Sequence, residues 1–157
     1  MKHAIAPTTL AIVFAAVFVL GIVPTAQAGE QRECSNASLR GSFGFTITGT
    51  HLTLPSPFAG PFAEVGRQTF DGNGNTDLAA TLSSNGNIVR VTSQGTYDVN
   101  PDCTGALTLF VSPFGVTIHA DFVIDDDGTE LRVIATDAGV VESREYRKQF
   151  TRRREDW

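Results

Sequence analysis

The sequence predicts an all-β fold, an eight-stranded antiparallel up-and-down barrel, with a two-sheet β-sandwich as the alternative. Runs of residues alternate between apolar and polar side chains, the period of half-buried strands. Short turns rich in Gly, Asn and Asp separate these runs, and no helical segment long enough for a crossover lies between them. Closure removes the two unpaired edges of an open sheet, whereas a sandwich usually needs longer crossovers, so a closed barrel is favoured.

The first 28 residues have the pattern of a targeting sequence. Lys2 supplies a positive start, an apolar run extends from Leu10 to Val23, and Ala26-Gln27-Ala28 is a small-residue cleavage site, as in a secretory signal peptide. A membrane-spanning helix is the alternative, but the run is shorter than the ~20 residues that a bilayer requires. We expect cleavage after Ala28, a secreted or periplasmic protein, and no membrane attachment of the mature chain.

The predicted domain organisation is a signal peptide over residues 1–28, one barrel domain over residues 29–150 and a basic tail over residues 151–157. Eight strands are predicted in the barrel domain: Leu39–Thr50, Phe62–Phe70, Asp77–Ser83, Ile88–Val99, Leu107–Val111, Val116–Ile124, Glu130–Asp137 and Val140–Phe150.

Turn chemistry separates the strands in the first half. The longest connection, His51–Gly60, is rich in Pro and apolar residues, and it is either a lid over the barrel mouth or a plain connector. The next turn, Asp71 to Asn75, contains Asp-Gly and Asn-Gly, which accept positive φ and are strong hairpin signals. Asn85-Gly86 makes the following turn.

The stretch from Ile88 to Val111 is predicted to be a β-hairpin with one buried and one exposed face. Asn100-Pro101-Asp102 supplies its turn, and Cys103 follows directly. Cys34 and Cys103 are the two cysteines of the chain. In an oxidising compartment, two distant cysteines favour a structural disulfide, with two buried thiols as the alternative. The bridge would tie the hairpin to the start of the mature chain.

The second half repeats the pattern, with turns at Pro113-Phe114-Gly115, Asp125 to Gly128 and Ala138-Gly139. The C-terminal residues have no strand pattern. Arg152, Arg153 and Arg154 are predicted to join Arg144, Arg147 and Lys148 in a basic patch. This patch is either a solvated tail or a docking site for an anionic partner.

Composition and motif searches exclude several functions. The formal charge of −5 becomes −6 without Lys2, which argues against nucleic acid as a partner, because phosphate contacts need a basic face. The two histidines after the leader, His51 and His119, support neither a hydrolytic triad nor a zinc site. His119 and Asp121 share a polar face that we expect to be exposed. No metal and no cofactor is expected.

The turn from Asp71 to Asp77 places oxygen-bearing side chains at every second residue, like the start of a calcium loop. It lacks the glycine after the third ligand and has Leu82 where a bidentate acid should stand, so the calcium-loop pattern fails. A hairpin turn is the preferred interpretation.

Glu64 is the weak catalytic candidate. It shares a strand face with Phe62 and Phe70. If that face points inward, burial raises the pKa of the carboxyl, which could then act as a general acid or orient a ligand. If Ala63 and Val65 point inward instead, Glu64 is a surface residue. Because unpaired buried acids are rare, a surface position or a structural pairing is expected for Glu64.

Four segments carry a family resemblance: Gly41–Phe45, Val65–Asn75, Gly95–Gly105 and Asp121–Gly139. In these the chain resembles a group of small secreted bacterial proteins without an assigned activity. Their architecture resembles calycin-type barrels, in particular allene oxide cyclase-like and dirigent-like barrels, and less closely lipocalins. The resemblance implies cofactor-free cyclisation or coupling of apolar, reactive small molecules, and dimers or trimers. None of the catalytic residues of those barrels matches a position here.

Three functions remain open. The first is binding of a small apolar molecule in the lumen, lined by Phe43, Phe45, Tyr97, Leu109 and Phe122, for which a packed core is the alternative. The second is a cofactor-independent cyclase or isomerase that uses an inward polar group such as Glu64. The third is a non-enzymatic structural or interaction module with a solid core. The volume of the lumen separates the third from the other two.

Overall fold

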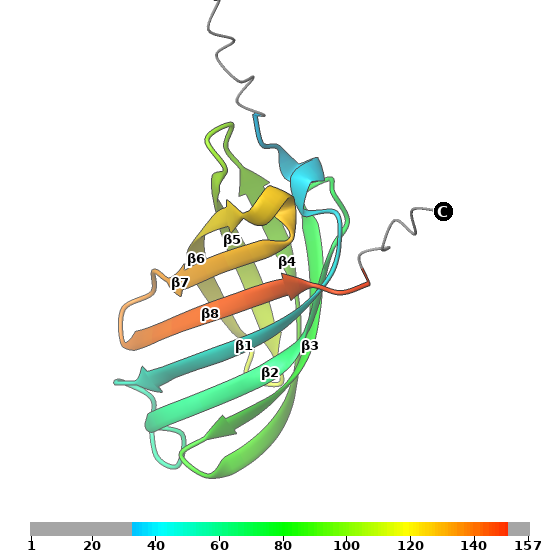
Figure 1. Ribbon diagram of the computed structural model, residues 1–157. Coiled ribbons are helices and arrows are strands. Elements are labelled where there is room, and N and C mark those ends of the chain that lie inside the picture. The colour runs from blue at the N-terminus through cyan, green and yellow to red at the C-terminus, as the bar shows by residue number, and fades with distance from the viewer. Residues whose placement is uncertain (1–32, 151–157) are drawn as a thin grey trace, which may run out of the picture. The chain divides into compact units, whose positions relative to one another are not determined.

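The computed structural model describes residues 33–150, which form a closed barrel (Figure 1). The predicted signal peptide and the basic tail at residues 151–157 lie outside the described residues. The strands are β1 (Gly41–His51), β2 (Gly60–Phe70), β3 (Asn75–Ser84), β4 (Asn87–Val99), β5 (Thr104–Ser112), β6 (Val116–Asp125), β7 (Glu130–Ala135) and β8 (Val140–Lys148). The predicted eight-stranded up-and-down barrel is confirmed, and the sandwich alternative is excluded.

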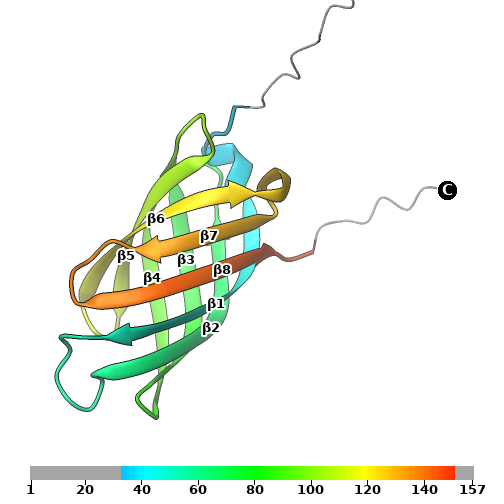
Figure 2. The ribbon, with the colours of Figure 1, turned by 60° about the vertical axis from the view of Figure 1, so that its left-hand side comes forward.

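Pairing of the first strand with the last closes the sheet. β1 and β8 run antiparallel and side by side (Figure 2), with Phe43 opposite Lys148 and His51 opposite Val140. Each strand from β2 to β7 pairs with the strands that precede and follow it in the sequence. Within residues 33–150 both sides of each strand are therefore paired, which removes the exposed edges of an open sheet.

The predicted alternation sets which side chains face inward. In β1, Phe43, Phe45 and Ile47 are buried, whereas Thr46 and Thr48 between them are exposed. The same period holds in the other strands. Aromatic rings fill the interior near the start of β1, where Phe70 makes edge contacts with Phe43 and Tyr97 at centroid distances of 5.5 and 5.0 Å. This part of the lumen is a packed core.

The N-terminal segment covers the same end of the barrel, which we call the closed end. A short 3₁₀ helix, η1 (Asn36–Leu39), precedes β1, and Leu39 is fully buried. Asn36 fixes this helix to β4, because its Oδ1 accepts the N–H of Val99 at 2.8 Å and its carbonyl accepts the Tyr97 hydroxyl at 3.0 Å. A second turn, η2 (Asp126–Gly128), joins β6 to β7 at this end.

A disulfide attaches the closed end to the central hairpin. Cys34 and Cys103 are bonded, with Cα atoms 4.9 Å apart and a sequence separation of 69. The predicted bridge is confirmed, as is the hairpin β4–β5 that carries Cys103. A structural disulfide indicates an oxidising, extracellular or periplasmic environment. Among residues 33–150 no helix is long and apolar enough to span a bilayer.

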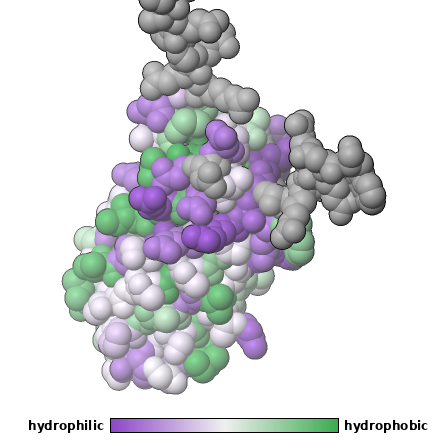
Figure 3. All heavy atoms as spheres, in the orientation of Figure 1, coloured by the Kyte–Doolittle hydropathy of each residue, from purple (hydrophilic) through white to green (hydrophobic). Residues whose placement is uncertain are grey.

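The opposite end, which we call the mouth, is surrounded by the β1–β2 loop and the β3–β4, β5–β6 and β7–β8 turns. Hydrophilic residues gather over the upper and middle part of the face in Figure 3, whereas the lower part, towards the β1–β2 loop, is largely neutral or apolar. Several large apolar side chains at the mouth are exposed: Leu52, Leu54, Phe114 and Val116.

Candidate functional site

A cavity of about 480 Å³ occupies the mouth half of the barrel. Its volume lies in the range typical of small-molecule sites, roughly 300–1,000 Å³. All eight strands or their mouth loops contribute to its lining. The lumen is thus divided between the aromatic core at the closed end and this cavity at the mouth.

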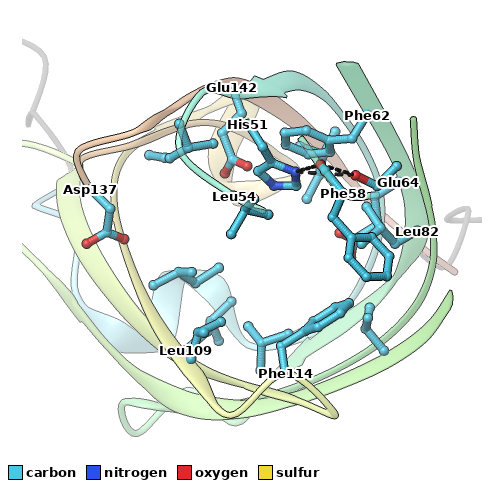
Figure 4. A pocket seen from close by; sticks show the side chains of 18 of the residues that line it. His51, Leu54, Phe58, Phe62, Glu64, Leu82, Leu109, Phe114, Asp137 and Glu142 are labelled. Carbon is cyan, nitrogen blue, oxygen red and sulfur yellow. Dashed lines mark hydrogen bonds between the residues drawn. The ribbon is translucent and has the colours of Figure 1, made fainter. Parts of the chain in front are cut away.

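One side of the cavity is apolar, and we call it the apolar wall. It comes from β5, β6 and the turn between them, and its members are Leu109, Val111, Phe114, Val116 and Ile118. Figure 4 shows Leu109 and Phe114 on this side, across the cavity from His51 and Glu142. Leu78, Leu82 and Val91 extend the apolar surface over β3 and β4.

The opposite side, which we call the polar wall, consists of His51, Glu64, Glu142 and Arg144 from β1, β2 and β8. The strand register explains why they meet. Glu64 and Arg144 both pair with Ile47 of β1, from its two sides. All three residues face the lumen, and two strand spacings of about 4.8 Å separate the backbones of Glu64 and Arg144.

Glu142 and Arg144 form a buried ion pair. Their side chains are 7% and 2% exposed, and the Arg144 Nε–H donates to Oε1 of Glu142 at 2.5 Å, with Nη2 on the same oxygen. Burial alone lowers the pKa of Arg144, but its interactions with Tyr146 and Glu142, including a side-chain hydrogen bond to each, raise the pKa above its ordinary value. The guanidinium therefore stays protonated, and its positive charge is neutralised by Glu142.

The Glu64 carboxyl accepts no hydrogen bond and forms no ion pair within the described part of the chain. Burial raises its pKa from the ordinary value of 4.5 to about 7, because removal from water disfavours the charged form. Arg144 opposes this rise and Glu142 adds to it. At neutral pH, the protonated and the ionised forms of the Glu64 carboxyl are therefore both populated.

A chain of hydrogen bonds begins at Tyr146, which is hydrogen-bonded to Arg144 of the polar wall, and leads towards the closed end. The Tyr146 hydroxyl donates to Oε1 of Gln68 at 2.9 Å, and Gln68 Nε2 donates to Thr76 Oγ1 at 2.9 Å. The Thr76 hydroxyl donates to the carbonyl of Thr69 at 2.9 Å. Burial raises the pKa of Tyr146 to about 12. Tyr146 therefore remains a neutral donor in this network.

The β1–β2 loop, for which a lid and a plain connector were the two alternatives, borders the mouth. Leu54, Pro55 and Phe58 of this loop line the cavity, and the Phe58 ring lies 5.7 Å from that of Phe114 across the mouth. Ser84 Oγ donates to the carbonyl of Phe58 at 3.0 Å. Asn85 and Asn87 each donate a side-chain N–H to the carbonyl of Pro57, at 3.3 and 3.2 Å, so polar side chains at and beside the β3–β4 turn hold the loop in place.

His51 belongs to the same contact. Its Nδ1 lies 3.4 Å from both Ser84 Oγ and the carbonyl of Phe58, the dashed contacts at His51 in Figure 4. Its ring stacks on Phe62, with centroids 4.1 Å apart and planes inclined by 8°. The imidazole therefore connects the loop to the polar wall.

The structure places the predicted lining residues in two groups. Leu109 borders the cavity, but Phe43, Phe45, Tyr97 and Phe122 do not. These four are buried in the core towards the closed end, in the packed arrangement that was the alternative. The correction has a simple cause, because η1 and the disulfide close their end of the barrel and the aromatic rings there fill it.

Glu64 also requires a correction. A surface position or a structural pairing was expected, but Glu64 faces the lumen together with Phe62 and Phe70, and Ala63 and Val65 are exposed. The residue thus has the inward environment described for the catalytic alternative. Its neighbours explain how an acid is tolerated there, since Arg144 and the cavity itself offset part of the loss of water.

Arg144 corrects the predicted basic patch, because it points into the barrel and not to the surface. The sequence interpretation missed Glu142, Arg144 and His51 as members of a site. In β8 both faces carry polar residues, with Glu142 and Arg144 on one side and Ser143 and Glu145 on the other. The alternation itself could have identified Glu142 and Arg144, because residues two and four positions before the inward-facing Tyr146 must also face inward.

The remaining predictions concern the surface. The Asp71 carboxylate accepts the N–H groups of Asn73 and Asn75 at 2.7 and 3.0 Å, so this segment is a hairpin turn. No group of three or more His, Cys, Asp or Glu in the described residues is placed to hold a metal ion. His119 and Asp121 are exposed as predicted, and His119 Nδ1 pairs with Asp137 at 2.9 Å.

Comparisons with known proteins identify the fold alone. No family model matches the chain, and no curated protein is significantly similar to it. A redesigned β-barrel of known structure is similar, with a TM-score of 0.50 and 17% sequence identity, covering 73% of this chain and 95% of that one. At such low identity the similarity concerns the architecture only.

Proposed function

We propose that this protein is a secreted barrel that binds a small, largely apolar molecule in the cavity at its mouth. The cavity carries the proposal: a lumen packed throughout would have left no space, but about 480 Å³ remains beside the core. That volume exceeds the roughly 30 Å³ share of one water molecule many times. It supports ligand binding over a solid interaction module.

The distribution of polarity supports the same proposal. The apolar wall provides surface whose transfer from water drives binding, and the polar wall offers a small number of groups that can orient a ligand. The β1–β2 loop and the Phe58–Phe114 contact narrow the entrance. The predicted signal peptide and the disulfide agree with action outside the cytoplasm.

Binding is tested by titration with N-phenyl-1-naphthylamine, a neutral probe that fluoresces in apolar surroundings. We expect a saturable rise in fluorescence with the wild-type protein. Ala135→Phe, which fills the cavity from β7, should abolish the rise, whereas Ala63→Phe on the exposed face of β2 should preserve it. Equal titrations of the two variants, or no binding by the wild type, would overturn the proposal. Native mass spectrometry of the exported protein then identifies what co-purifies.

A second candidate is a cofactor-independent cyclase or isomerase of the allene oxide cyclase-like type. Glu64 favours it, because a carboxyl with a pKa of about 7 can both give and accept a proton at neutral pH. Isomerisation conserves atoms and electrons: Glu64 donates a proton to the bound molecule and recovers one at another atom. The cavity would hold the reactive molecule in one folded conformation.

This activity is tested with an unsaturated epoxide of fatty-acid size that cyclises spontaneously to a racemic product. An enzyme should give an enantiomeric excess, measured by chiral chromatography. Glu64→Gln should lose the excess but keep probe binding. A racemic product with the wild type at saturating protein would leave binding as the function.

A further inference from the structure

The charges around the cavity are not balanced. Glu142 and Arg144 neutralise each other, with two guanidinium nitrogens on one carboxylate oxygen. Glu64 lies beside this pair with no ion-pair partner within residues 33–150. When Glu64 is ionised, the polar wall therefore carries one uncompensated negative charge.

Three other titratable groups in or beside the cavity, His51, Tyr146 and Asp137, are already engaged. His51 contacts Ser84 and the Phe58 carbonyl, and the Tyr146 hydroxyl donates to Gln68. Asp137, at the β7–β8 turn, accepts the backbone N–H of His119 at 2.6 Å and pairs with its imidazole. The residues opposite Glu64 on β1 and β3 are Ile47 and Leu82, which are apolar.

Arg144 is a poor receptor for an anionic ligand. Its side chain is 2% exposed, and its Nε and Nη2 both bind Glu142. An anion would have to displace Glu142 and would meet the charge of Glu64 as well. Removal of one partner from a buried pair is strongly unfavourable. The charge distribution thus favours a cation.

We propose that the ligand of this cavity is an apolar amine, an aryl or alkyl body with one protonated amino group that pairs with the Glu64 carboxylate while the body packs on the apolar wall. The inference rests on the proposed function and names its ligand class. An ammonium group supplies both the missing positive charge and N–H donors, and charge-assisted hydrogen bonds are about twice as strong as neutral ones. A neutral alcohol supplies only the donor.

The test compares three probes with the same body: 4-phenylbutylamine, 4-phenylbutan-1-ol and 4-phenylbutanoate. Dissociation constants are measured by calorimetry with the intact protein at pH 8. We expect the amine to bind at least about tenfold more tightly than the alcohol, a difference of ~1.4 kcal/mol, and the carboxylate to bind most weakly. Glu64→Gln should remove the preference for the amine and leave alcohol binding nearly unchanged. Glu145→Gln, on the exposed face of β8, is the matched control.

The pH dependence in the wild type provides a test that needs no variant. Because the pKa of Glu64 is about 7, its carboxylate form decreases below that pH, while the aliphatic amine stays protonated. Affinity for the amine should therefore fall by about tenfold between pH 8 and pH 6, and affinity for the alcohol should not.

The outcomes separate the two proposals. If the alcohol binds but the amine gains nothing, or if Glu64→Gln keeps the preference, the amine assignment is overturned and the apolar cavity remains. If the carboxylate binds most tightly, the assignment is overturned in favour of an anion. If neither these probes nor N-phenyl-1-naphthylamine bind, the proposed function fails, and the amine assignment fails with it.

Discussion

Arg144 and Glu142 form a nearly solvent-free ion pair inside a barrel whose interior is otherwise dominated by aromatic and aliphatic side chains. Such pairs contribute little net stability when intact, but loss of one partner leaves an uncompensated charge. The Arg144 charge also lowers the pKa of Glu64, so the pair affects the carboxyl that we place at the ligand.

Arg144→Met should destabilise the fold by roughly 3–5 kcal/mol, because Glu142 remains buried without its partner. Urea unfolding at pH 7.5 measures the change. Adding Glu142→Leu should recover most of the loss, since both charges are then absent. A single variant within about 1 kcal/mol of the wild type would contradict the ion-pair interpretation.

Glu64→Gln should stabilise the protein at pH 8 and have little effect at pH 4.5. The folded pKa of Glu64 is raised from 4.5 to about 7, so the folded state holds the proton more tightly than the unfolded state. Stability is therefore lost as the pH rises from 4.5 to 7, by an amount on the order of 3 kcal/mol for this shift. Chemical unfolding across this range should show a slope in the wild type that is absent in the variant.

Cys34→Ser combined with Cys103→Ser should lower the free energy of unfolding by roughly 4 kcal/mol, the chain-entropy value for a closed loop of this length. Urea midpoints of the oxidised wild type and the double variant measure the loss. A reductant should lower the wild-type midpoint and leave the variant unchanged. Probe binding by the folded variant should persist, because the bridge lies at the closed end; its loss would show that the two ends are coupled.

Phe114→Ala should accelerate ligand exchange. The Phe114 ring contacts Phe58 across the mouth, so its removal widens the entrance while Leu109 and the polar wall remain. Stopped-flow fluorescence with N-phenyl-1-naphthylamine should show association and dissociation rates that both rise several-fold, with a smaller change in affinity. Phe110→Ala, at an exposed position of β5, provides the control. Unchanged rates would mean that the ligand enters elsewhere.

The strands and their turns could be predicted because alternation and turn chemistry are local properties of the chain. Alternation in a strand places Phe43, Phe45 and Ile47 on one face. The Asp-Gly and Asn-Gly pairs of the β2–β3 turn accept the positive φ that a hairpin requires. Alternation does not say how far along the barrel a side chain lies, however. The cavity lies at the mouth because η1, Leu39 and the disulfide close the other end, and that arrangement depends on long-range contacts.

The polar wall was harder to predict for a different reason. Inward positions are usually recognised by their apolar side chains, but the inward face of β8 carries Glu142 and Arg144 between Val140 and Tyr146. Their burial is explained by two features of the folded barrel: Glu142 and Arg144 form an ion pair with each other, and Arg144 and Glu64 flank Ile47 on the two neighbouring strands. The sequence could nominate Glu64 but could not choose its face, since one residue of register decided it.

The division of the lumen has a consequence for how such a chain can change. The residues that pack the core lie mostly in the closed-end half of the barrel, and those that line the cavity lie in the mouth half. A library randomised at Leu109, Ile118 and Ala135 should therefore give many well-folded variants with altered ligand specificity. A library randomised at Phe43, Phe70 and Tyr97 should give few folded variants.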